Sequence, residues 1–370
     1  MTALRTTRTR LAAALLGTAL AVASLAACGS DSNTSSVSSS GGDASKANCA
    51  TGTITASGST AQANAMSQWI KDYQTTCSGA TINYQGVGSG AGIEQFTQGS
   101  TAFAGSDSAL KDTEAPKADA RCKTGKALDL PMVAGPIAIE YNLSGVDSLT
   151  LTPKLLAGIF SNKITKWDDP AIAAANSGVK LPSTAIQAFH RSDSSGTTDN
   201  FTKYLAAAAK ADWTFDHAKE WKAPGGQGAK GSDGVTSGVK GAQGAIGYAE
   251  FSFAKNAALG IAKIDNGGGA VELTTDNVSK AVETAKITGS GNDLKLSLDY
   301  TTTSVAYPIL LVTYEITCEK GLAADQLKLV KGFLGYTVSD GGQQSLVDLG
   351  YAPLPKSIQA KVKAAVDALS

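Results

Sequence analysis

Three segments of this chain repeat one pattern: a short strand, a turn of small residues, and a helix. The expected strands cover 51–56, 80–85 and 184–189, and each runs into a turn rich in glycine, serine or threonine. Apolar residues such as Met66 and Ile70 then recur at the spacing of a helix face. Strands that alternate with helices in this way predict an α/β fold.

The three turns share the chemistry of an anion site. They cover 57–60, 86–90 and 190–197. The first turn of a helix leaves backbone N–H groups unpaired and carries a partial positive charge, and glycine lets a ligand approach closely. Each turn alone is more simply explained by ordinary helix capping by serine or threonine. The repetition favours a shared anion-binding site.

Charged side chains accompany these turns. Arg191 offers a planar fork that suits an oxyanion, and Asp193 could hold that fork in place. The alternative for Arg191 is a surface salt bridge. Asp107 follows a short apolar run and a glycine, so it is expected at a strand end. It is either a helix N-cap or a carboxylate at the mouth of the same cleft.

The composition limits the functions that are open to the chain. Its 370 residues correspond to about two domains at roughly 150 residues each. The 32 basic and 32 acidic side chains cancel, so no overall field attracts nucleic acid. With two histidines and neither a Walker A nor a Gly-x-Ser-x-Gly motif, enzyme chemistry lacks its usual residues. We therefore expect no enzymatic activity, no cofactor and no metal.

The N-terminus reads as a targeting segment over 1–27. Three arginines precede an apolar stretch at 11–25, which is short for a membrane span of about 20 residues and typical of a signal peptide. Small residues before Cys28 resemble a bacterial lipobox, in which this cysteine is lipidated. The alternative is an ordinary cleavage site after Ala27. Residues 28–47 are rich in serine and glycine and predict a disordered tether.

Four further cysteines suggest two disulfides in an exported chain. In the first unit, a strand followed by an antiparallel helix returns the chain to its starting point, which places Cys77 near Cys49. By elimination, Cys122 would pair with Cys318. Three connectivities are possible, and free buried thiols are the alternative.

Together these residues resemble the PstS family, the phosphate-binding subunit of the high-affinity phosphate ABC transporter. The similar segments occur in the family's order and span nearly all of the globular part. They are TINYQGVGS at 81–89, GSD at 105–107, KITKWDD at 163–169, RSDSSGT at 191–197, GAIGY at 244–248 and DLGYAPLP at 348–355.

The resemblance implies two α/β lobes joined by two crossing strands, which is the type II periplasmic-binding-protein-like fold. The apolar runs 128–142 and 304–313 are the expected crossings. Lobe one would then cover 48–132 plus 308–370, and lobe two 133–307. The glycine-rich segment within lobe two is expected to form a loop that is mobile or packed against the sheet edge, and it covers 224–244.

The resemblance also implies a ligand set for phosphate. The family's contacts fall on Thr60, Ala61, Ser89, Asp107, Arg191, Ser195, Gly196 and Thr197. Asp193 would orient Arg191. The family commonly has an aromatic residue where this chain has Ala61, whose main-chain N–H can still donate.

The implied function is capture of inorganic phosphate between the lobes and delivery to the membrane permease subunits of a phosphate ABC transporter. The protein would be a monomer on the outer face of the bacterial cytoplasmic membrane, held there by a lipid on Cys28, without nucleic acid as a partner. Two alternatives remain: a binder of another tetrahedral oxyanion such as sulfate, and a phosphate-scavenging or adhesion surface lipoprotein. A carboxylate at Asp107 argues against sulfate, which carries no proton to share.

Overall fold

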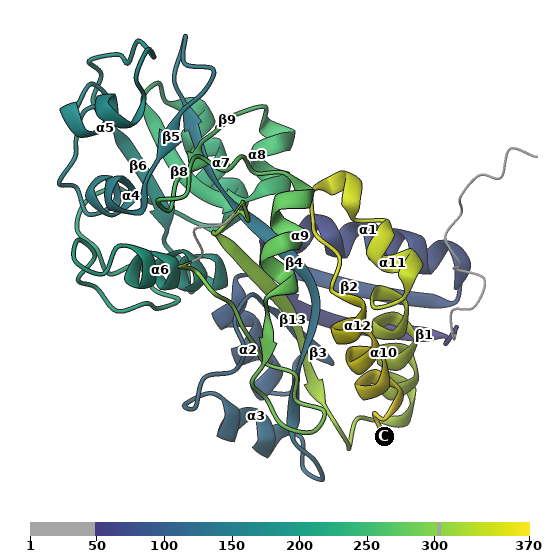
Figure 1. Cartoon of the computed structure of the whole chain (residues 1–370). Coiled ribbons are helices and arrows are strands. Elements are labelled where there is room, and N and C mark those ends of the chain that lie inside the picture. The colour runs from purple at the N-terminus through teal and green to yellow at the C-terminus, as the bar shows by residue number, and fades with distance from the viewer. Residues whose placement is uncertain (1–48, 302–304) are drawn as a thin grey trace, which may run out of the picture. The chain divides into compact units, whose positions relative to one another are not determined.

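The computed structural model describes residues 49–301 and 305–370 (Figure 1). The expected signal peptide, the tether and the lipidation site at Cys28 lie outside the described residues. Within the described ranges, no helix is both long enough and apolar enough to cross a membrane.

One mixed sheet runs through the described chain in the order β2-β1-β3-β13-β4-β8-β6-β7, with the short β9 beside β4 (Figure 1). Strand β4 is buried along almost its whole length, and β13 pairs with it antiparallel. Parallel pairing joins β1 to β2 and β3, and β6 to β7 and β8. The strands are β1 (Gly52–Gly58), β2 (Ala80–Gly86), β3 (Phe103–Ser106), β4 (Ala127–Asn142), β6 (Gln187–Arg191), β7 (Gln227–Ala229), β8 (Ala245–Glu250), β9 (Gly260–Ile261) and β13 (Leu310–Cys318).

Helices and short strand pairs complete the described fold. The helices are α1 (Ala63–Thr76), α2 (Ser89–Thr97), α3 (Ala115–Arg121), α4 (Pro153–Phe160), α5 (Pro170–Ala175), α6 (Gly196–Ala208), α7 (Gly231–Gly241), α8 (Phe251–Ala257), α9 (Thr275–Glu283), α10 (Ala324–Thr337), α11 (Asp340–Gln344) and α12 (Lys356–Asp367), with a 3₁₀ turn at Val347–Leu349. Short pairs are formed by β5 (Thr150–Leu151) with β10 (Lys263–Ile264) and by β11 (Lys286–Ile287) with β12 (Leu296–Ser297).

Two large hydrophobic cores divide these elements into two lobes. The first core includes Trp69 and Phe333, and the second includes Trp167 and Tyr248. We call the elements around the first core lobe one and those around the second lobe two. The cores meet along the long strands, because β4 contributes to both. The two-lobed α/β fold expected from the sequence is therefore present.

The crossing strands differ from expectation at one end. Strand β4 agrees with the predicted run, but β13 begins at Leu310 and continues to Cys318, whereas the sequence favoured 304–313. Pro308 explains the later start, because proline has no N–H for the ladder and is tolerated only at the edge of a strand. β-Branched and aromatic residues then carry the strand into lobe one.

The hairpin of β11 and β12 packs against lobe one. Leu294, between its two strands, is buried in the first core, and its backbone N–H donates to Asp129 O at 3.0 Å. The Asp129 N–H in turn donates to Asp293 Oδ1 at 3.0 Å. This hairpin lies inside the range 133–307 that was expected for lobe two, so the chain between α9 and β13 contacts lobe one before it returns.

The glycine-rich segment 224–244 is not the loop that the sequence predicted. It forms β7 and α7, and Val235 and Val239 of α7 are buried in a small core with Phe189. A Cβ atom built on Gly238 would lie 2.5 Å from Phe189 Cε1. Glycine thus lets the helix approach the sheet closely, which offsets its low helix propensity.

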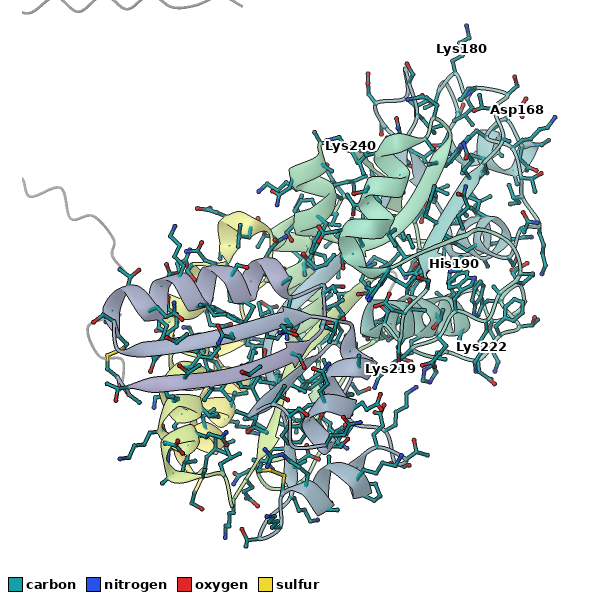
Figure 2. All side chains as sticks on the ribbon, turned by 180° about the vertical axis from the view of Figure 1, so that it is seen from behind. Asp168, Lys180, His190, Lys219, Lys222 and Lys240 are labelled. Carbon is teal, nitrogen blue, oxygen red and sulfur yellow. A yellow bond between two sulfur atoms is a disulfide. The ribbon has the colours of Figure 1, made fainter. Side chains whose placement is uncertain are left out.

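Two disulfides stabilise lobe one, Cys49–Cys77 and Cys122–Cys318, and they join the same cysteines as the favoured pairing. Each appears as a yellow bond in Figure 2. The parallel register of β1 and β2 opposes Gly52 to Ala80, which brings the cysteines that flank these strands together. The second disulfide joins cysteines that are 196 residues apart. It therefore closes the longer loop and reduces the conformational freedom of the unfolded chain more than the first disulfide does.

Replacing Glu140 with glutamine should flatten the pH dependence of stability. Glu140 is fully buried on β4, its Oε2 accepts from Thr236 Oγ1, and burial raises its pKa to about 8. The folded state therefore holds this proton more tightly than the unfolded state, so stability falls as pH rises from about 4.5 through about 8. Urea unfolding at pH 5.5 and 8.5 should show that Glu140→Gln loses less stability than wild type, with a difference on the order of a few kcal/mol. Equal losses in both proteins would show that Glu140 is ionised in the folded state.

Candidate functional site

The turns at the carboxyl ends of β2 and β6 meet between the lobes. Helix α2 begins at Ser89 and helix α6 at Gly196, and Ser195 caps α6 by accepting from Thr198 N–H at 3.2 Å. The Gly196 N–H donates to Ser89 Oγ at 3.2 Å. A Cβ atom on Gly196 would lie 2.6 Å from that oxygen, so glycine allows the two helix starts to approach.

Asp107 lies at the centre of this meeting point and is 2% exposed. Its Oδ1 accepts from Ser59 Oγ at 2.5 Å, and its Oδ2 accepts from Thr197 Oγ1 at 3.3 Å and from Ser89 Oγ at 3.5 Å. Burial raises the pKa of Asp107 to about 6, against the lowering effect of these hydroxyls and of Arg191. At neutral pH the carboxylate is therefore ionised and can accept a hydrogen bond from a ligand.

The helix-cap alternative for Asp107 does not fit this geometry. The next helix, α3, begins at Ala115, and the hydroxyls that contact the carboxylate come from three different turns.

Arg191 is buried, with 2% of its surface exposed, which rules out a surface salt bridge. Its Nε donates to Asp193 Oδ1 at 2.7 Å and its second guanidinium nitrogen to Asp193 Oδ2 at 2.5 Å. Burial alone would raise the pKa of Asp193, but the hydrogen bonds and charge of Arg191 outweigh it and lower that pKa. Asp193 also accepts from Gly231 N–H at 3.1 Å. Asp193 thus holds the Arg191 fork in the arrangement expected from the sequence.

The first turn contributes Thr60 and Ala61. Thr60 Oγ1 lies 2.9 Å from Ser232 Oγ and accepts from Ser232 N–H at 3.1 Å, so it contacts the start of α7 in lobe two. The Ala61 N–H donates to Ser59 Oγ at 3.0 Å. Ala61 is fully buried and packs in the second core, and helix α1 begins two residues later, at Ala63.

Several residues at this site were not named as site residues by the sequence analysis, although Ser59 lies in the predicted turn 57–60. Ser59 and Ser232 contact predicted site residues directly, Tyr248 accepts from the Arg191 N–H at 3.2 Å, and Asn200 Nδ2 donates to Asp107 O at 2.6 Å. Ser232 is the second residue of α7, and the helical spacing of the valines in α7 was the available signal. Tyr248 belongs to the GAIGY segment at 244–248 but was given no role, and Asn200 had no local signal, because only the fold brings these two residues to their partners.

Side-chain contacts also join the lobes around the site. Ser108 Oγ donates to Asp199 Oδ2 at 2.7 Å, and Asp199 is fully buried in the first turn of α6. Lys219 of lobe two, which is labelled in Figure 2, pairs with Glu114 of lobe one at 2.6 Å, and the Lys219 side chain is 2% exposed. These polar contacts depend on the lobes being together, so they favour the closed arrangement of the described structure.

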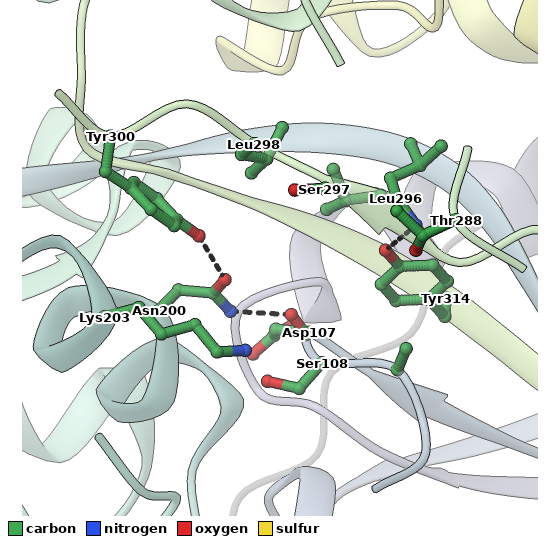
Figure 3. Close-up of a pocket in the computed structure, with 12 residues that line it drawn as sticks. Asp107, Ser108, Asn200, Lys203, Thr288, Leu296, Ser297, Leu298, Tyr300 and Tyr314 are labelled. Carbon is green, nitrogen blue, oxygen red and sulfur yellow. Dashed lines mark hydrogen bonds between the residues drawn. The ribbon is translucent and has the colours of Figure 1, made fainter. Parts of the chain in front are cut away.

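A cavity of about 340 Å³ lies beside the Asp107 turn (Figure 3). On one wall the Tyr300 hydroxyl donates to Asn200 Oδ1 at 2.8 Å, next to the Asn200 bond to Asp107 O. Lys203 also lines the cavity, and its Nζ pairs with Asp199 at 2.7 Å. The polar groups on this wall are engaged in contacts within the protein, so the cavity borders the anion site without extending it.

Buried donors from both lobes meet around Asp107 with Arg191 nearby, an arrangement that suits an oxyanion in a binding protein of the two-lobed class. Consistent with this class, residues 43–341 match the family model of a PBP superfamily domain. The phosphate-binding protein PstS 3 of Mycobacterium leprae is 42% identical over 364 residues, which is 96% of this chain and 98% of that protein. The phosphate-binding protein PstS 2 of Mycobacterium tuberculosis is 43% identical, covering 94% of this chain and 95% of its own length.

A solved structure shows the same similarity in three dimensions. It is described as a high affinity periplasmic phosphate-binding protein bound with phosphate, and it matches with a TM-score of 0.70 and 25% identity over 85% of this chain and 93% of its own. With these relatives, the chain belongs to the PstS family of phosphate-binding proteins.

Proposed function

We propose that this protein captures inorganic phosphate outside the cytoplasm and delivers it to a phosphate ABC transporter. The observation that carries the proposal is a buried carboxylate, Asp107, within a site whose other groups are N–H and hydroxyl donors and the Arg191–Asp193 pair. A fully ionised anion would be repelled by Asp107, whereas a protonated phosphate can donate to it. The names of the relatives and of the matching structure agree with this ligand.

In this proposal the ligand set is the one expected from the sequence. The Arg191 fork and the N–H groups of Gly196 and Thr197 would bind phosphate oxygens from lobe two, with Ser195 contributing its hydroxyl. Lobe one would contribute the remaining ligands, which are Thr60, Ala61, Ser89 and Asp107. Among them, Asp107 would accept a hydrogen bond from the proton of the phosphate. In the described structure the hydroxyls of Ser89 and Thr197 donate to Asp107, and Ser89 also accepts from the Gly196 N–H. The ligand would replace these contacts.

The proposed lobes are 48–132 plus 308–370 and 133–307, with the β11–β12 hairpin of the second range packed on lobe one. Phosphate would bind between the lobes and stabilise their closure. Release would need the lobes to separate at the transporter. The protein acts by binding alone, as a monomer without enzymatic activity.

The proposed location is the outer face of the cytoplasmic membrane. The support is the sequence pattern of an apolar signal segment, a lipobox-like Cys28 and a serine-rich tether. The 18 residues 29–46 of this tether would reach roughly 20–25 Å as a flexible coil, which leaves the binding lobes free to meet the permease. Mass spectrometry of the membrane-extracted protein would show whether Cys28 carries the lipid.

Phosphate should reduce the radius of gyration in solution, because it contacts both lobes and favours their closed arrangement. Small-angle scattering with and without saturating phosphate measures this change, and calorimetry on the same sample should give one phosphate per chain. Arg191→Lys at the same phosphate concentration is the control, since weaker binding should leave more of the protein open. An unchanged radius at calorimetric saturation would contradict closure, and absence of any heat of binding would contradict the function itself.

A further inference from the structure

A buried glutamate in lobe one has no place in the ligand set described above. Glu315 lies on β13, is fully buried, and both of its carboxyl oxygens lack a hydrogen-bond partner in the structure. It forms no ion pair with a lysine, arginine or histidine of the described residues. An ionised carboxylate without a partner is among the most costly groups to bury.

The surroundings of Glu315 lead to the anion site. Glu315 is opposite Gly105 in the β13–β3 register, so both face the same side of the sheet. A Cβ atom on Gly105 would lie 1.6 Å from Gln62 Nε2 and 2.4 Å from the Tyr84 hydroxyl oxygen. The Gln62 side chain is therefore packed over Gly105, beside the Glu315 carboxyl with which it interacts. Two residues after Gly105 the chain reaches Asp107.

The hydrogen bonds of Gln62 are directional. The Tyr84 hydroxyl donates its single proton to Ser59 O at 2.8 Å, so it must accept from Gln62 Nε2, which lies 2.8 Å away. This orients the amide with nitrogen toward Tyr84. Gln62 Oε1 is then a buried acceptor without a donor, and the Glu315 carboxyl on the same side of the sheet also lacks a partner. One proton on Glu315 would satisfy both groups.

We propose that Glu315 is a positioning residue of the phosphate site, which holds a proton and donates it to Gln62 Oε1. The chain of donors then runs from Glu315 through Gln62 and Tyr84 to the main-chain carbonyl of Ser59, and the hydroxyl of this same residue donates to Asp107. The proton has a second effect: between Glu315 and Asp107, the two carboxyl groups that lobe one places here, it leaves Asp107 alone with a negative charge. The measurements of phosphate affinity described below rest on the proposed function, whereas the infrared test for the Glu315 proton does not.

Electrostatics agree with this geometry. Burial raises the pKa of Glu315 well above its ordinary value; the side chain of Gln62 lowers it in part, and the negative charge of Asp107 raises it further. The titratable groups that face Glu315 are Tyr84 of β2 and Asp107 after β3, and the pKa of Tyr84 is also raised by burial and by Glu315. At alkaline pH, loss of the Glu315 proton would place a second negative charge beside Asp107 and remove the donor to Gln62. Phosphate should then bind more weakly.

The proton itself can be tested without phosphate. An infrared difference spectrum between wild type and Glu315→Gln at pH 7 should contain the C=O stretch of a protonated carboxylic acid. Glu140→Gln is the matched control, because Glu140 is equally buried, has a pKa raised to about 8, and lies on β4 in lobe two. A carboxylate band in place of the acid band for Glu315 would overturn the proposal.

The positioning role is tested by phosphate affinity as a function of pH. Over the pH range in which the Glu315 acid band is lost from the infrared spectrum, wild type and Glu140→Gln should lose on the order of tenfold more affinity than Glu315→Gln, which is about 1.4 kcal/mol. Comparison with Glu315→Gln removes the contribution of phosphate's own ionisation, and this variant keeps a neutral amide donor at the same place. Superimposable pH profiles for wild type and Glu315→Gln would overturn the role. If wild type bound no phosphate at any pH, the proposed function would fail, while the infrared band would still decide whether Glu315 is protonated.

Discussion

Replacing Asp107 with asparagine is expected to lower the preference for phosphate over sulfate by about a thousandfold. At neutral pH phosphate keeps at least one proton and sulfate keeps none. The buried Asp107 carboxylate can accept that proton as a hydrogen bond, but it meets sulfate as a like charge, which costs several kcal/mol. An asparagine amide can donate to sulfate and removes the repulsion. Competition by sulfate against bound phosphate, measured in both proteins, gives the ratio.

A second buried aspartate supplies the control for this experiment. Asp129 on β4 is fully buried, and its pKa is raised to about 7 by burial and by Asp293, but its Oδ1 accepts from the Leu110 N–H away from the ligand set. Asp129→Asn should therefore leave the selectivity ratio unchanged. If wild type already bound sulfate as tightly as phosphate, the chemical argument for a phosphate site would be lost.

The pH dependence of selectivity offers an independent check on Asp107. Its pKa of about 6 implies that the carboxylate gains a proton as pH falls through 6. Protonated Asp107 can donate to sulfate, so sulfate should compete better at pH 5 than at pH 7.5 in wild type. Asp107→Asn has no proton to gain and should show no such rise in sulfate competition. An equal rise in both proteins would assign the effect to another group.

Substitution of Arg191 by lysine should weaken phosphate binding roughly ten- to a hundredfold. Lysine keeps the charge but loses the two-pronged geometry that Asp193 holds in place. Loss of charge-assisted hydrogen bonds costs on the order of 1.5–3 kcal/mol, which corresponds to that range in the dissociation constant. Calorimetric titration with phosphate measures it directly.

Arg121→Lys is the matched control, since Arg121 is the other arginine in the described part of the chain. It lies in α3 of lobe one, donates to backbone carbonyl oxygens, and stacks over Phe96. This substitution should leave the affinity for phosphate unchanged although it alters a part-buried guanidinium. Native affinity in Arg191→Lys would show that Arg191 stabilises the lobe without binding the ligand.

Much of the site could be predicted because its residues lie in short local patterns. A glycine-and-hydroxyl turn between a strand and a helix places N–H groups at the helix start wherever it occurs, so 86–90 and 190–197 were identified from sequence. Asp193 is two residues from Arg191, and their pairing is a local contact. The strand and helix of the first unit likewise brought Cys77 to Cys49 by short-range geometry.

Other features depended on residues far apart in the chain. The segment 224–244 read as a loop because its glycines lower helix propensity, but close packing of Gly238 on Phe189 stabilises α7 and places Ser232 against Thr60. The β11–β12 hairpin packs on lobe one through Leu294, although its neighbours in sequence belong to lobe two.

The sequence by itself determined the α/β class, the helix starts that supply N–H donors, and the Arg191–Asp193 pair, because each follows from residues close together in the chain. The tertiary structure alone decided that Asp107 is buried among hydroxyls from three turns, that α7 joins the site, and that Glu315 faces Gln62. The reason is physical: hydrogen-bond capacity belongs to the residue type, whereas burial, pairing and the resulting charge state depend on which distant segments pack against it.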